Sequence, residues 1–131
     1  MQDNEKRALS TARIKHAEEC ISSARELYAT GNYKSAANRS YYAAFHAMRS
    51  VLAFDEIDMK HHSGILSEFR RRYIKSGIFG SEYSDILSAL FDVRTDSDYD
   101  DFFIISKEDL AIQLENSEKF LKAVKDYLNN L

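Results

Sequence analysis

Arg94, Asp98 and Tyr99 have the residue types and the spacing of a small phosphate-binding or proton-transfer site. They lie within the run Arg94-Thr-Asp-Ser-Asp-Tyr-Asp100. Arg94 and Asp98 are four residues apart, so on a helix they share one face and can form an ion pair. The planar guanidinium of arginine also suits bidentate contact with a phosphate. The pattern alone leaves two interpretations open: an ordinary ion pair within a helix, or a phosphate site in which Asp98 orients Arg94.

A second set of polar residues lies earlier in the chain, at spacings of three, four and three residues. This spacing places them on one stripe of a helix, roughly opposite a core stripe of mostly apolar residues. The stripe is either a solvated polar face or a second buried side that faces a partner subunit or a ligand. In the second case, Arg39 and His46 are candidate contacts to a nucleotide or a phosphate. The polar stripe consists of Arg39, Tyr42, His46 and Arg49, and the core stripe of Ala37, Tyr41, Ala44, Met48 and Val51.

Three further clusters carry weaker signals. The adjacent His61 and His62 do not share a helix face, which favours structural or surface roles over a metal site. The aspartates between residues 92 and 101 lack the spacing of a calcium loop, so we expect a solvated loop. The basic run Arg70–Lys75 could contact phosphates, or it could complement the dipole at a helix C-terminus. No catalytic triad, phosphate-binding loop, dinucleotide fingerprint or zinc motif is present, so we expect neither a metal nor a cofactor.

Apolar residues at helical spacing predict the elements that must position these side chains. Gly31 suits the end of the first helix, and Asn32, Ser81 and Ser106 are candidate N-caps. Ser106 and Asp109 together resemble a capping box. The predicted helices are one that contains Ile14–Tyr28, one over about Tyr33–Phe54, one near Ser63–Lys75, one from Ser81 through Val93 that the acidic stretch ends or distorts, and one from Ser106 to Leu131.

Composition limits the class of protein. The chain has 131 residues, 44% of them hydrophobic, and contains no proline, which predicts a single all-α domain over residues 1–131, an antiparallel bundle of about five helices. The net charge of −3 gives no global attraction to nucleic acid, so any RNA contact must be local. A single cysteine, a polar N-terminus and the lack of a long apolar run predict a cytoplasmic protein with no membrane association.

Three stretches, in this order and spacing, resemble the HEPN family, named for higher eukaryotes and prokaryotes nucleotide-binding. The resemblance extends from about residue 9 to residue 128. The stretches are Arg39-Ser-Tyr-Tyr-Ala-Ala-Phe-His46, Lys60-His-His-Ser-Gly-Ile-Leu-Ser-Glu-Phe69 and Arg94-Thr-Asp-Ser-Asp-Tyr-Asp100.

This resemblance implies a helical bundle that pairs with itself and a toxin-like role beside a minimal nucleotidyltransferase that serves as antitoxin. It also implies a metal-independent endoribonuclease, whose motif is an arginine, four to six variable residues and a histidine. Histidine suits proton transfer near neutral pH, and arginine suits stabilisation of charge on a phosphate. By this resemblance Arg94 binds phosphate, Asp98 orients it, and Tyr99 contacts the substrate or receives AMP from the partner enzyme.

The sequence departs from the family motif at one position. Tyr99 stands where the motif histidine is expected, and no histidine follows His62. An ordinary tyrosine, with a pKa near ~10, is a poor base at neutral pH. His46 or His61 could supply a base from elsewhere in the fold. The alternatives to a ribonuclease are a non-catalytic module that binds a nucleotide or presents itself to its partner, and a purely structural helical adaptor.

Overall fold

The computed structural model describes residues 1–58 and 61–131, and in this part of the chain it is a helical bundle without strands. The prediction of an all-α bundle of about five helices is confirmed. A short 3₁₀ turn, η1 (Ala53–Asp55), follows α2, and a single π-helical turn, η2 (Arg70–Ile74), follows α3. The α-helices are α1 (Asp3–Ala29), α2 (Tyr33–Leu52), α3 (His62–Phe69), α4 (Glu82–Tyr99) and α5 (Lys107–Asn129).

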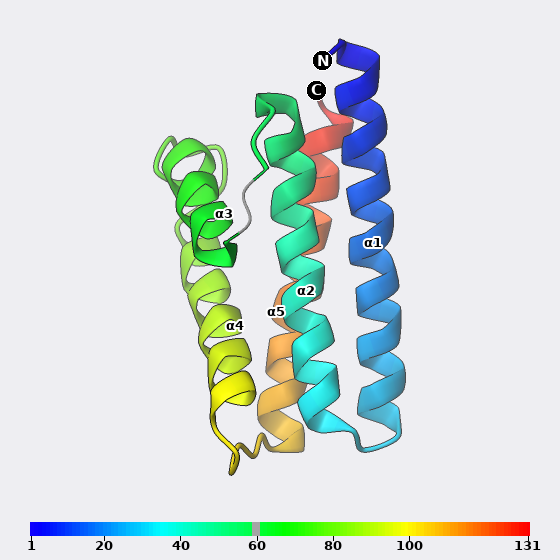
Figure 1. The fold of residues 1–131 in the computed structure, drawn as a ribbon, viewed down its shortest axis with the longest axis vertical. Helices are drawn as coiled ribbons and strands as arrows, with labels where there is room; N and C mark the ends of the chain where they lie inside the picture. The colour runs from blue at the N-terminus through cyan, green and yellow to red at the C-terminus, as the bar shows by residue number, and fades with distance from the viewer. Residues whose placement is uncertain (59–60) are drawn as a thin grey trace.

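Helix α2 lies at the centre of the arrangement. It packs against α1, α5, α4 and α3. In Figure 1, α1 and α2 form an antiparallel pair, α5 runs behind them, and α3 and α4 cover the other side of α2, with both chain termini at one end. None of the described helices is long and apolar enough to cross a membrane.

Small residues let α2 contact so many neighbours at once. Ala37, Ala44 and Ala47 are buried, which allows adjacent helices to approach closely. The larger core side chains come from the surrounding helices, with Ile65 and Phe69 from α3 and Phe120 from α5 fully buried. Consequently α2 is buried on more than one side, and its polar residues have protein around them rather than open solvent.

The helix ends differ from the predicted ones in three places. α2 ends at Leu52, and Phe54 lies in the 3₁₀ turn. α3 ends at Phe69, and the π-turn takes the chain to Ile74 in place of a regular helix to Lys75. α4 continues through most of the acidic stretch to Tyr99, and the Arg94–Asp98 ion pair joins successive turns of this part of the helix. Met59 and Lys60, in the predicted connection and at the start of the second motif, lie outside the described residues.

Of the three predicted side-chain caps, one is confirmed. The Ser106 hydroxyl accepts the Asp109 backbone N–H at 3.0 Å. Asn32 and Ser81 occupy N-cap positions but make no capping bond; Asn32 donates to the Thr30 hydroxyl instead. Gly31 has φ +81°, the left-handed conformation that glycine adopts without penalty after a helix.

Candidate phosphate-binding site

Arg94 is held on α4 by two neighbours. Its Nε lies 3.0 Å from the Asp98 carboxylate, and its Cζ lies 5.6 Å from the centroid of the Tyr41 ring on α2. The Nε–Asp98 contact is an ion pair and not a hydrogen bond. The Nε atom is buried and has no hydrogen-bond partner in the described residues. The two terminal NH₂ groups donate no hydrogen bond within residues 1–58 and 61–131. Arg94 is thus fixed at one end and open at the other.

His62, the first residue of α3, lies beside the same tyrosine. Its Nδ1 is 2.9 Å from the Tyr41 hydroxyl, and its ring packs on Phe45 with the ring centroids 4.1 Å apart. Burial lowers the pKa of His62, and the positive charges of Arg94 and Arg49 lower it further. At neutral pH this imidazole is therefore uncharged. Arg94 and His62, from different helices, share Tyr41 as a common neighbour.

The sequence analysis did not identify His62 as a site residue, and it named His61 or His46 as the replacement base. The structure separates the adjacent histidines, since His61 is the exposed N-cap residue of α3 while His62 is half-buried. A signal for this was present in the spacing. His62 precedes the buried Ile65 by three residues and Phe69 by seven, which places it on the core side of α3.

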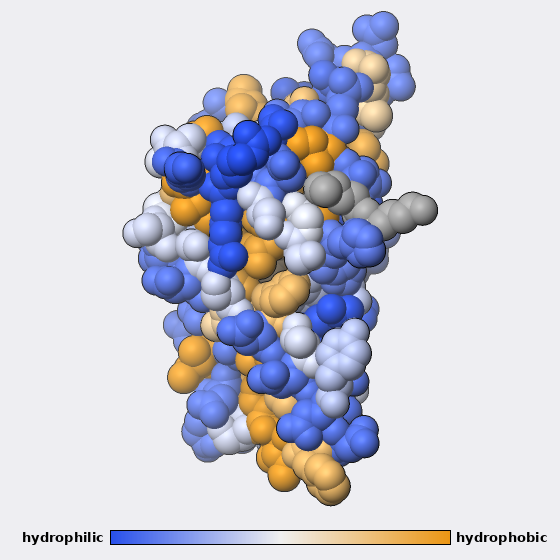
Figure 2. All heavy atoms as spheres, turned by 60° about the vertical axis from the view of Figure 1, so that its left-hand side comes forward, coloured by the Kyte–Doolittle hydropathy of each residue, from blue (hydrophilic) through white to orange (hydrophobic). Residues whose placement is uncertain are grey.

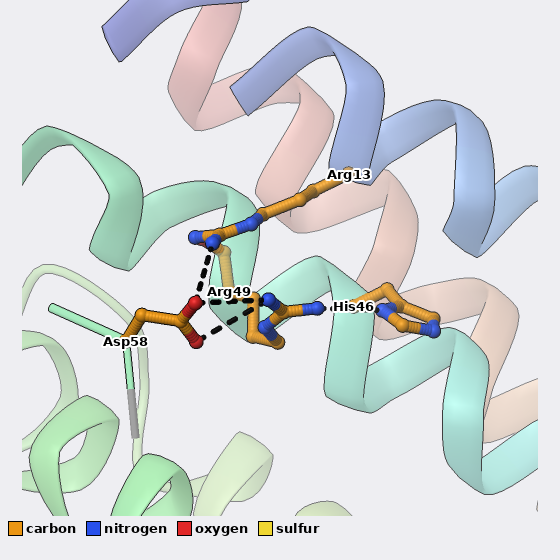
Figure 3. A network of polar contacts seen from close by, with 4 residues as sticks. All are labelled: Arg13, His46, Arg49 and Asp58. Carbon is orange, nitrogen blue, oxygen red and sulfur yellow. Dashed lines mark hydrogen bonds and ion pairs between the residues drawn. The ribbon is translucent and has the colours of Figure 1, made fainter. Parts of the chain in front are cut away.

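A second cluster joins α1, α2 and the segment after η1 (Figure 3). The buried Arg13 donates to the Arg49 carbonyl at 2.9 Å and to Asp58 at 3.3 Å. Arg49 donates to both oxygens of Asp58, at 3.2 and 3.3 Å. His46 lies next to Arg49, with 3.5 Å between its Nδ1 and Arg49 Nη1. Figure 3 shows the two guanidinium groups converging on one carboxylate, so this cluster fixes the segment to the bundle.

The polar stripe predicted on α2 is half-buried along its length. Arg39 lies over the Tyr42 ring at 5.0 Å and donates to Asn38. Tyr42 in turn contacts the rings of His46 and His62, with centroids 6.2 and 5.5 Å away. Burial lowers the pKa of His46 to about 4, with further contributions from nearby arginines and His16. Tyr42, which lies next to Arg39 and His46, also contacts the ring of Tyr41, over which Arg94 lies, so the polar stripe adjoins the Arg94 site.

Tyr99 lies apart from this site. It is the last residue of α4 and 81% exposed. Five residues separate it from Arg94, which is a rotation of about 140° around the helix axis. The structure therefore brings Arg94 and Asp98 together and leaves Tyr99 on a different face, so the predicted set of three does not form one cluster.

The remaining predicted clusters have local partners. Arg70 donates to the side chains of Ser84 and Ser88 on α4. Arg71 and Arg72 both pair with Glu68. The basic run therefore stabilises the turn from α3 to α4. The acidic cluster at the end of α4 and just after it is exposed to solvent. It consists of Asp92, Asp96, Asp98, Asp100 and Asp101.

Comparison with known proteins identifies the family. The HEPN domain matches residues 10–127. A UPF0332 protein of Thermotoga maritima is 28% identical over 98% of this chain and 97% of its own length. A protein of Methanocaldococcus jannaschii whose name describes it as a candidate toxin is 31% identical over 88% of this chain and 78% of its own. The crystal structure of an archaeal HEPN homologue has the same fold, with a TM-score of 0.64, 22% identity, and 91% and 97% of the two chains covered. The chain belongs to the HEPN domain family.

Proposed function

We propose that this chain is a toxin-like HEPN effector that binds RNA through its phosphates, with Arg94 as the central contact. The observation that carries the proposal is the state of Arg94: Asp98 and Tyr41 hold it in place, and its terminal NH₂ groups donate no hydrogen bond within the described residues. The relative that is named a candidate toxin supports the toxin-like role. In this proposal an arginine presents a preformed fork, so little conformational freedom is lost on binding.

The charge around Arg94 supports an anionic ligand. The two clusters on this face of α2 and its neighbours contain four arginines, Arg13, Arg39, Arg49 and Arg94, and two aspartates, Asp58 and Asp98. The whole chain carries −3, so this positive excess is local. Half-burial also weakens competition from water, which strengthens a guanidinium–phosphate contact relative to an exposed one.

The direct test measures binding of a fluorescently labelled single-stranded RNA by anisotropy. Arg94→Ala removes a charged hydrogen-bonding group, and we expect at least about tenfold weaker binding. Arg25→Ala is the matched control, because Arg25 pairs with Glu118 on α5 and lies outside the site. Circular dichroism checks that both variants are folded. Equal RNA affinity in wild type and Arg94→Ala would contradict the proposal.

A cellular test addresses the toxin-like role. Bacteria that express the wild-type chain without any partner gene are compared with bacteria that express Arg94→Ala. We expect growth arrest with the wild type and normal growth with the variant. The state of cellular RNA then separates two mechanisms, because fragmented RNA identifies a ribonuclease and intact RNA identifies action by binding.

The proposal extends to a minimal nucleotidyltransferase as partner, with Tyr99 as the group presented to it. The supporting observation is the 81% exposure of Tyr99 at the end of a rigid helix. Transfer of AMP from ATP would join the phenol oxygen to the α-phosphorus and release pyrophosphate. Co-expression with such an enzyme should raise the mass of the wild-type chain by one adenylyl group and leave Tyr99→Phe unchanged. An unchanged wild-type mass would remove this part of the proposal.

Self-association is the remaining part of the proposal. Figure 2 shows apolar side chains at the lower end of the face that includes α3 and α4. Phe102 and Ile104, in the connection between α4 and α5, are 88% and 89% exposed, and exposed apolar groups of this size favour a partner surface. We expect a dimer in sedimentation experiments that Ile104→Glu weakens. A monomer at all concentrations would contradict self-pairing.

A further inference from the structure

The hydrogen bond between Tyr41 and His62 determines where the imidazole proton lies. Tyr41 is 3% exposed, and the partner of its hydroxyl in the described residues is His62 Nδ1 at 2.9 Å. Burial raises the pKa of Tyr41, so the phenol keeps its proton and must donate it to an acceptor. Since Nδ1 is that acceptor, it carries no proton of its own. The single proton of the neutral ring is then on Nε2.

The surroundings of His62 keep the ring neutral. The positive charges of Arg94 and Arg49 face it from α4 and α2, opposed by Asp98, and Phe45 and Tyr42 pack on its ring. A second proton on Nδ1 would also force the buried Tyr41 hydroxyl to become an acceptor and leave its own proton without a partner. The ring therefore offers one hydrogen-bond donor, Nε2–H, and its position is fixed by Tyr41 and Phe45.

We propose that Nε2–H of His62 and the terminal NH₂ groups of Arg94 bind the same phosphate group of an RNA ligand, with Tyr41 as the positioning residue that selects the tautomer. This inference rests on the proposed function, since it assigns a second phosphate contact to the same site. His62 and Arg94 adjoin Tyr41 from different helices. A nitrogen that already carries a proton cannot accept the proton of a ribose 2′-hydroxyl. The site consequently binds the phosphodiester and does not cleave it through His62.

Nuclear magnetic resonance tests the tautomer without any ligand. The full chain is labelled with ¹⁵N, and long-range ¹H–¹⁵N spectra are recorded near neutral pH, with His62 assigned from its absence in His62→Gln. We expect an unprotonated Nδ1 and a protonated Nε2 in the wild type, and a mixture of tautomers in Tyr41→Phe. A protonated Nδ1 in the wild type, or an unchanged tautomer in Tyr41→Phe, would overturn the inference.

RNA binding tests the contact itself with two substitutions. The amide of His62→Gln can reach the position of Nε2–H, whereas His62→Asn has no group at that position but retains an acceptor for Tyr41. We expect His62→Gln to bind labelled RNA within about threefold of wild type and His62→Asn about tenfold more weakly, as for loss of one hydrogen bond to a charged group. Equal affinities of the two variants would overturn the inference.

The same titration separates this inference from the proposed function. If Arg94→Ala leaves RNA binding unchanged, the proposed function itself fails. If Arg94→Ala weakens binding while both His62 variants bind as the wild type does, only the role of His62 fails. If the wild type cleaves RNA and His62→Gln retains binding without cleavage, His62 acts in proton transfer and the inference is overturned.

Discussion

The two arginine clusters beside α2 differ in how much of each guanidinium is already used. In the first, Arg13 and Arg49 donate to Asp58, and Arg13 also donates to a backbone carbonyl. In the second, Arg94 pairs with Asp98 through Nε, donates no hydrogen bond in the described residues, and lies over Tyr41. An arginine whose donors are occupied holds the chain together, while one with free donors can bind a ligand at little structural cost. The comparison therefore assigns structure to the first cluster and function to the second.

The histidines of the two clusters show the same contrast. Burial is the main cause that resists protonation of His46, and the positive charges of Arg49, Arg39 and Arg13 add to it. His62 has its ring position set by Tyr41 and Phe45. Both histidines have a lowered pKa, so a lowered pKa alone does not distinguish them. The difference lies in the partner of each Nδ1 atom, which is Arg49 Nη1 at 3.5 Å for His46 and the Tyr41 hydroxyl at 2.9 Å for His62.

The largest expected effect is on the free energy of unfolding, which a substitution in the Arg13–Arg49–Asp58 cluster should lower more than one at Arg94. Arg13→Met retains the aliphatic part of the side chain but leaves the Arg49 carbonyl with only its backbone donor, the Ala53 N–H, and Asp58 with one partner fewer. We expect the free energy of unfolding to fall by about 2–3 kcal/mol. The same change at Arg94 removes an ion pair between half-exposed groups, and we expect a loss below about 1 kcal/mol. Urea denaturation of both variants measures this difference.

RNA binding provides the complementary measurement on the same two proteins. Folded Arg13→Met should bind RNA within about threefold of wild type, whereas Arg94→Met should lose about tenfold or more. If the two substitutions have equal effects on stability, or if Arg13→Met weakens RNA binding as much as Arg94→Met, the distinction between the clusters is wrong.

The sequence was sufficient for the fold but only partly for the site. Helical periodicity identified the helices because each must bury one stripe, and Gly31 and Ser106 marked ends whose chemistry is local. The length of α4 was underestimated, because the Arg94–Asp98 ion pair joins its last turns in the stretch where the turn preference of the aspartates was expected to end the helix. Asn32 and Ser81 lie at helix starts without capping bonds, so position was predictable and side-chain geometry was not.

The contacts within the site show why the rest of it could not be predicted from the sequence. The Arg94–Asp98 pair follows from spacing along one helix. The contact between Tyr41 and His62 joins α2 to α3 over 21 positions, and no periodicity within either helix specifies it. Arg13 is more distant still from Asp58, at a sequence separation of 45 positions. Long-range polar contacts depend on how helices dock, which apolar patterns determine only coarsely.

An intermediate effect is expected from His46 as pH is lowered. Its pKa falls from an ordinary 6.5 to about 4 on folding, so between these values the unfolded chain binds more protons than the folded one. The contribution of neutral His46 to the free energy of unfolding is thus fully present above about pH 6.5. It is lost as the pH falls toward about 4, and the loss is on the order of 2 kcal/mol. Urea denaturation at about pH 7.5 and about pH 5 should show a smaller pH effect in His46→Gln than in wild type. Identical pH effects in the two proteins would show that His46 does not cause the pH dependence of stability.

The smallest effect is expected from Arg25, and it sharpens what makes Arg13 important. Arg25 contacts both oxygens of Glu118 at 2.8 Å, a geometry at least as good as that of Arg13 with Asp58 at 3.3 Å. The Arg25 side chain is 61% exposed, however, and that of Arg13 is 8% exposed. Exposed ion pairs contribute little because water solvates the separated charges almost as well. We expect Arg25→Met to lower the unfolding free energy by less than about 1 kcal/mol and to leave RNA binding within about twofold of wild type. A loss comparable to that of Arg13→Met would mean that bond geometry, rather than burial, decides which arginines stabilise this bundle.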